Sequence, residues 1–79
     1  MPNMDYSELL AEMKRNGYTQ KTLAEAVNIT PSHFSRKLSG EYVFTQDEMR
    51  NILFILNLDI ARNISRIFFT PRVEKTQQT

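Results

Sequence analysis

The amino-acid sequence predicts an all-α protein built from five short helices. Apolar residues recur at helical spacing in successive segments, capping residues precede these segments, and no alternating strand pattern occurs apart from a weak one over 42–44. The chain has 79 residues, room for one domain, and its 41% hydrophobic and 24% charged residues are ordinary for a globular protein. We expect a single domain over 1–70.

The first helix is expected to begin at Asp5, whose side chain can cap it, and Glu8 would complete a pair resembling a capping box. Asn16-Gly17 ends this helix, since both residue types tolerate the left-handed conformation. Its expected apolar stripe consists of Leu9, Leu10 and Met13.

Thr19 can cap the second helix and Thr30 the third, where Pro31 takes the first helical position and its missing N–H costs nothing. Asn28 lies between the two helices and accepts a positive φ with little strain. Gly40 closes the third helix. The inner faces consist of Leu23, Ala24 and Val27 in the second helix, and of Phe34 and Leu38 in the third.

Thr45-Gln-Asp-Glu48 is a capping box before a fourth helix that Asn57 can end, and Asp59 can cap a short fifth helix. Pro71 forbids helical continuation, so we expect 71–79 to form a short, extended and flexible C-terminal tail. The expected core stripes are Met49, Ile52, Leu53 and Leu56 in the fourth helix, and Ile60, Ile64 and Ile67 in the fifth.

Residues 20–40 have the pattern of a helix-turn-helix. Two steeply crossed helices need a small residue where they approach, which Ala24 provides, and the turn between them needs a positive φ, which Asn28 tolerates. Apolar residues must then lock the pair together. The sequence supplies Leu23, Val27, Ile29, Phe34 and Leu38.

Positive charge gathers in the same part of the chain. The net charge is only +1, but segment 14–40 contains five basic residues against the single acid Glu25, whereas 1–13 and 41–50 are net acidic. This distribution suggests a basic face for a polyanion. On charge alone, a solvated helix surface explains it equally well.

From Tyr6 to Ile67 the chain resembles the lambda-repressor-like family, which includes Cro- and repressor-type regulators of temperate phages. The resemblance rests on the order of five helices, the pair Leu23-Ala24 and the ending Phe34-Ser-Arg-x-Leu-x-Gly40. Two positions depart from the family pattern: Asn28 replaces the usual turn glycine, and Lys37 stands where many relatives have an apolar residue.

The resemblance implies that the third helix, over 30–39, lies in the major groove of double-stranded operator DNA. Arg36 is the first candidate for base readout, because a guanidinium can bond O6 and N7 of guanine together. The base-reading candidates are Pro31, Ser32, His33, Ser35 and Arg36. The phosphate-binding candidates, which position the protein without reading sequence, are Gln20, Lys21, Lys37, Ser39 and Tyr42.

Enzyme chemistry is not expected, because no catalytic arrangement is visible. The chain has no cysteine, and His33 is its only histidine. Its carboxylates are best explained as helix caps and exposed helix charges. We therefore expect no enzyme activity, metal, cofactor or small-molecule substrate. The lack of an ~18-residue apolar run and of a signal peptide predicts a cytoplasmic protein with no membrane partner.

Phe54 is expected on the outer face of the fourth helix, with Ile55 on the flank. Either Phe68 and Phe69 cover it within the chain, or these residues together form a dimer interface. A homodimer is expected on separate grounds, since one module reads few bases and two-fold dimers read half-sites about 34 Å apart.

The sequence therefore favours a sequence-specific transcriptional regulator of the Cro type, which represses by occupying operator DNA. The alternative is a protein-interaction module, such as an antitoxin or antirepressor, whose binding surface is the exposed aromatic set Phe54, Phe68 and Phe69.

Overall fold

The computed structural model describes residues 4–70, and these form five helices and no strand. The helices are α1 (Ser7–Arg15), α2 (Gln20–Ala26), α3 (Pro31–Leu38), α4 (Gln46–Ile55) and α5 (Ile60–Phe68). The all-α prediction and the order of its five helices are confirmed. The tail expected over 71–79 lies outside the described residues.

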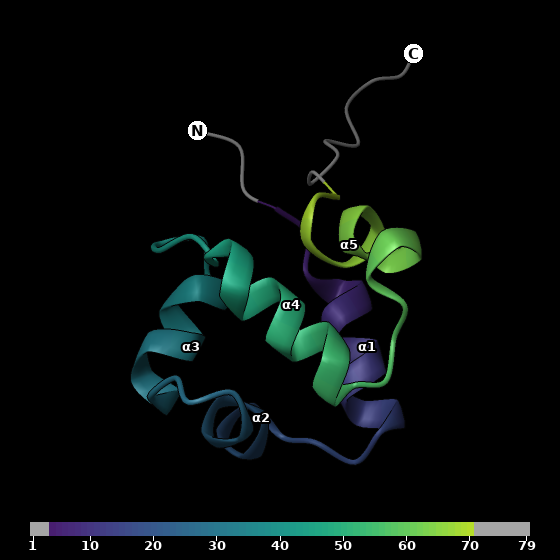
Figure 1. Ribbon diagram of the computed structural model, residues 1–79. Coiled ribbons are helices and arrows are strands. Elements are labelled where there is room, and N and C mark those ends of the chain that lie inside the picture. The colour runs from purple at the N-terminus through teal and green to yellow at the C-terminus, as the bar shows by residue number, and fades with distance from the viewer. Residues whose placement is uncertain (1–3, 71–79) are drawn as a thin grey trace.

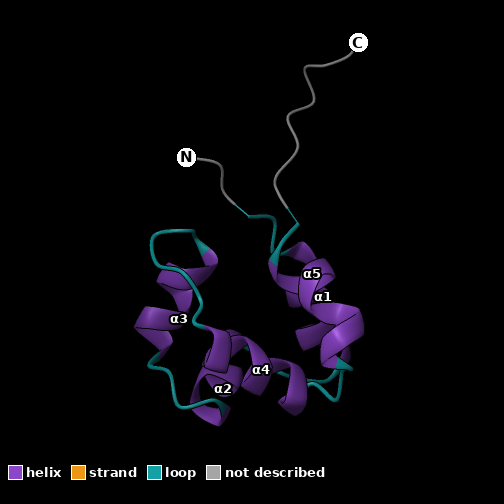
Figure 2. Ribbon diagram, turned by 45° about the horizontal axis from the view of Figure 1, so that its top comes forward, coloured by secondary structure: helices purple, strands orange, loops and turns teal. Residues whose placement is uncertain are grey.

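The helices are arranged as two pairs joined by α4. α2 packs on α3, α1 packs on α5, and α4 packs on α5. In Figures 1 and 2, α4 runs between the α2–α3 pair and the α1–α5 pair. The α2–α3 pair therefore forms one end of the molecule, away from α1 and α5.

Side-chain caps fix the starts of four helices as the sequence predicts. Thr19, Thr30, Thr45 and Asp59 each accept a hydrogen bond from the backbone N–H three residues later. The expectation for α1 is wrong in detail: its N-cap is Tyr6, which provides no side-chain cap. Asp5 instead accepts from the N–H and the hydroxyl of Ser7, at 2.9 and 2.7 Å, and Glu8 is turned toward α5.

Four residues with positive φ close or connect the helices. Asn28 (φ 63°), Asn57 (φ 61°), Gly17 (φ 78°) and Gly40 (φ 90°) all lie just after helices that the sequence ends at these points. Asn28 confirms that the turn between α2 and α3 uses the left-handed conformation without glycine.

Aromatic contacts in the core join α3, α5 and the start of α1 to the segment between α3 and α4. Phe44, between α3 and α4, is buried, and its ring centroid lies 5.2 Å from that of Phe68, 5.4 Å from Tyr6 and 5.9 Å from Phe34. The ring pairs meet edge to face, which is a favourable geometry. Burial also raises the pKa of the Tyr6 hydroxyl. Phe68, expected in a surface cover or an interface, is therefore a core residue.

Two residues expected in apolar stripes lie at the surface instead. Leu10 is 42% exposed, because α1 turns Leu9 and Met13 inward and leaves Leu10 on the flank. Ile60 is 36% exposed at the first turn of α5, whereas Ile67 near the other end of the helix is fully buried. Helical spacing identified the apolar stripes of α1 and α5, but the helices that pack on them cover only part of each stripe.

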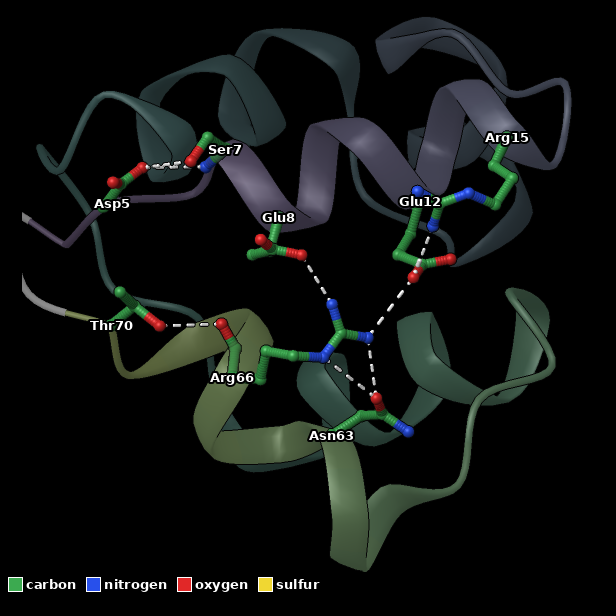
Figure 3. A network of polar contacts seen from close by, with 8 residues as sticks. All are labelled: Asp5, Ser7, Glu8, Glu12, Arg15, Asn63, Arg66 and Thr70. Carbon is green, nitrogen blue, oxygen red and sulfur yellow. Dashed lines mark hydrogen bonds and ion pairs between the residues drawn. The ribbon is translucent and has the colours of Figure 1, made fainter.

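An ionic network holds α1 against α5 (Figure 3). Nη1 of Arg66 lies 2.6 Å from Glu8, and its Nη2 lies 3.3 Å from Glu12, which is only 8% exposed. Arg15 also contacts Glu12, at 2.7 Å, and Asn63 accepts two hydrogen bonds from Arg66. Oε2 of the buried Glu12 carboxylate is thus paired with two arginines, which offsets the cost of burying its charge.

Candidate nucleic-acid interface

α2 and α3 pack on each other and are joined by a turn over 27–30, where the sequence predicts a helix-turn-helix. Ala24 has no exposed surface, so it can lie at the close approach of the two helices. Its carbonyl accepts the N–H of Ile29 at 2.8 Å across the turn formed by Asn28. Leu23 and Phe34, one from each helix, are fully buried. α3 is therefore fixed rigidly on α2, with its other side facing solvent.

All five base-reading candidates lie on the exposed part of α3. Phe34 faces the core and Leu38 is partly covered, so Ser32 and Arg36, four residues apart, fall on the opposite side of the helix. The three remaining candidates flank them and are also exposed: Pro31, His33 and Ser35. The structure thus brings the predicted residues together on one helix face.

The charged group at the centre of this face is Arg36. Its Nη1 lies 3.4 Å from Oε2 of Glu41 and 3.3 Å from the Tyr42 hydroxyl, and its guanidinium carbon lies 5.9 Å from the centroid of the Tyr42 ring. His33 packs edge to face on the same ring, at 5.7 Å. These polar contacts are long and the ion pair is exposed, so they restrain Arg36 only weakly and leave its guanidinium open to a ligand.

Gln20 and Lys21, two of the phosphate candidates, are exposed at the start of α2. Lys21 makes no salt bridge within residues 4–70. Thr19 caps this helix through a box with Thr22, a partner that the sequence interpretation missed. The side chains of Gln20 and Lys21 therefore remain available to an anion.

Lys37, another of the phosphate candidates, is less available than Gln20 and Lys21, because its ammonium group already has partners within the chain. Its side chain is 12% exposed, and its Nζ lies 2.9 Å from Oε1 of Glu48 and 3.0 Å from the carbonyl of Val43. The ammonium also lies 6.0 Å from the ring centroid of Phe44. Lys37 therefore fastens α3 to the start of α4 from within the chain.

Glu48 accepts hydrogen bonds both from Lys37 of α3 and from the backbone at the start of α4. Its Oε1 also accepts the Thr45 N–H at 2.9 Å as part of the α4 capping box. Burial by itself raises the pKa of Glu48, but the hydrogen bonds from Thr45 and the charge of Lys37 outweigh it and lower the pKa below its ordinary value. The capping pattern predicted Glu48, but not its bond to α3.

The other two phosphate candidates bond within the chain at the end of α3. The Ser39 hydroxyl donates to the Arg36 carbonyl at 2.9 Å, and the Tyr42 hydroxyl accepts from Arg36. Tyr42 is 40% exposed. Both side chains border the exposed face of α3 and order its last turn.

The residues proposed for an interface separate into three environments. Phe54 is 78% exposed and borders a surface hollow of about 230 Å³ with Ile55, Ala26 and Val27, so no part of residues 4–70 covers it. Phe69 is 51% exposed and borders a different, more apolar hollow of about 110 Å³. Phe68 is only 2% exposed. The aromatic set is thus not one surface.

Other kinds of site can be addressed for the described part of the chain. No group of three or more His, Cys, Asp or Glu side chains within residues 4–70 is placed to hold a metal ion. None of the five described helices has the length and apolar character needed to cross a membrane. Comparison with models of protein families and with curated protein sequences found no match to the chain.

Proposed function

We propose that this protein is a sequence-specific DNA-binding regulator that places α3 in the major groove of double-stranded DNA. The observation that carries the proposal is the rigid presentation of α3: a short helix, anchored on α2, with all of Pro31–Arg36 except Phe34 exposed. A major groove about 12 Å wide admits such a helix. The resemblance to the lambda-repressor-like family, from the sequence alone, supports the same docking.

In this proposal, Arg36 reads a guanine through paired hydrogen bonds, and Ser32 one turn earlier contacts a neighbouring base or phosphate. Gln20 and Lys21 bind backbone phosphates and fix the register of α3. Occupation of an operator in a bacterial cytoplasm, and hence repression of the Cro type, is the action that this proposal assigns to the protein.

A two-fold dimer supplies the selectivity that a single module lacks. Phe54 and Ile55 are the best placed of the predicted interface residues, because Phe54 is the most exposed aromatic side chain of the described chain. Phe54→Ser should therefore weaken cooperative binding to a two-half-site operator while leaving binding to a single half-site unchanged.

The test is selection of bound sequences from random DNA by the purified protein. The proposal expects an enriched palindromic site and an affinity that falls log-linearly with salt concentration. Arg36→Ala should cost about 1–3 kcal/mol at the selected site and relax preference at one base pair. Arg62→Ala, at an exposed position of α5, removes the same charge far along the chain and is the matched control.

The exposure of Phe54 also favours a second function, a protein-interaction module of the antitoxin or antirepressor kind. This alternative predicts no DNA binding at low salt and a stable complex with a different protein that Phe54→Ser abolishes. Two results together would decide against this alternative. The protein would select a palindromic DNA site, and the Phe54→Ser variant would still bind a single half-site of it.

A further inference from the structure

The guanidinium of Arg36 is held on one side only. Both of its side-chain hydrogen bonds use Nη1, which donates to Oε2 of Glu41 and to the hydroxyl of Tyr42. Within residues 4–70, Nε and Nη2 of Arg36 have no hydrogen-bond partner. These two nitrogens form one straight edge of the planar group, and that edge carries two parallel N–H donors.

The backbone explains why Glu41 and Tyr42 lie beside Arg36. Gly40 adopts a φ of 90°, and this left-handed residue turns the chain back over the last turn of α3. The Arg36 carbonyl then accepts the N–H of Glu41 at 2.9 Å and that of Tyr42 at 3.3 Å. The segment 39–42 is therefore hydrogen-bonded both to the backbone carbonyl of Arg36 and to the guanidinium of Arg36.

We propose that Glu41 and Tyr42 are positioning residues that present the Nε–Nη2 edge of Arg36 to a guanine and disfavour its use on phosphate. The proposal rests on the proposed function. O6 and N7 of guanine are neutral acceptors that match a two-donor edge, so Arg36 can bind them while Nη1 keeps its contacts. A phosphate brings an anion toward the Glu41 carboxylate, 3.4 Å from Nη1, and is repelled.

The carboxylate thus selects between two uses of the same arginine. Contacts to phosphate strengthen binding to every DNA sequence, whereas contacts to base edges strengthen binding only to the operator. With the Glu41 carboxylate beside it, Arg36 adds less to the general attraction for DNA, while its Nε and Nη2 donors stay free for guanine. Glu41 therefore raises the ratio of operator affinity to affinity for unrelated DNA.

The experiment measures dissociation constants of the full chain for the selected operator duplex and for a scrambled duplex of equal length. Glu41→Gln should raise affinity for scrambled DNA by up to about fivefold and raise operator affinity less, so that the ratio falls about twofold to threefold. Asp47→Asn is the matched control, because Asp47 is an exposed carboxylate 2.6 Å from Arg50 and its loss changes the net charge equally. It should leave the ratio unchanged.

Two further variants separate positioning from general electrostatics. In an Arg36→Ala background, Glu41→Gln should no longer change the ratio, since its effect acts through Arg36. Tyr42→Phe, which removes the hydroxyl and keeps the ring, should lower the ratio by a smaller factor. The inference is overturned if Glu41→Gln behaves as Asp47→Asn does, or if its effect persists without Arg36. If the wild-type protein binds neither duplex, the proposed function itself fails.

Discussion

Replacing Phe68 by alanine tests the packing that joins α5 to the segment between α3 and α4. The side chain is 2% exposed and meets Phe44 and Tyr6 edge to face, with centroid distances of 5.2 and 6.4 Å. Truncation of a buried Phe costs about 3–5 kcal/mol. A chain of 79 residues has a total stability of about 4–12 kcal/mol, so the variant should lose a large share of its stability.

The neighbouring Phe69 provides the control, because it is 51% exposed. Phe69→Ala should lower the free energy of unfolding by less than about 1 kcal/mol. Phe68→Leu, which keeps part of the buried volume, should cost about 1–2 kcal/mol and remain measurable if Phe68→Ala does not fold.

The assay is urea unfolding followed by far-ultraviolet circular dichroism, in which the midpoint and the slope give the free energy of unfolding. A loss for Phe69→Ala that equals or exceeds the loss for Phe68→Leu refutes the placement of Phe68 in the core. That result would return Phe68 to the surface role that the sequence suggested.

Three further predictions concern the helix-turn-helix and its attachment. Asn28→Ala should lower stability by about 1 kcal/mol or more, because alanine is strained at φ 63°, while Asn28→Gly should preserve or raise the melting temperature; equal effects of the two would contradict the strain argument. Lys37→Gln should destabilise by about 1–2 kcal/mol but leave the salt slope of operator binding unchanged, whereas a slope reduced by about one would restore Lys37 as a phosphate contact. The pKa of Glu48 is lowered on folding, so its contribution to stability is present above its ordinary pKa and is lost as pH falls through the lower folded value. Glu48→Gln should therefore flatten the acid side of the stability profile, and an unchanged profile would exclude this linkage.

The helix boundaries were predictable because each depends on residues near in sequence. Thr30 and Pro31 start α3 whatever lies around it, since the cap bonds an N–H three residues later. Asn28 likewise closes the turn through its own backbone conformation. Helical spacing also predicted that Phe54 faces outward, and the exposure of the base-reading candidates on α3 follows from the same rule.

The sequence alone could not decide which charged side chains form ion pairs within the chain, or which aromatic side chains pack in the core. Lys37, a plausible phosphate contact by type and position, is engaged by Glu48, and Arg66 pairs with Glu12 across 54 residues. Phe44 and Phe68 meet in the core, and Phe44 lies outside any helix, so no helical spacing marks it as a core residue. Phe68 does follow Ile60 and Ile64 at helical spacing, which is the signal that could have placed it in the core.

What the sequence by itself determined is therefore the set of helices, their caps and the face that α3 offers to solvent. What only the tertiary structure decided is which of the candidate side chains remain available on that face and what orients them. The reason is physical: caps and periodicity act within one or two helical turns, whereas ion pairs and aromatic contacts depend on how distant segments meet.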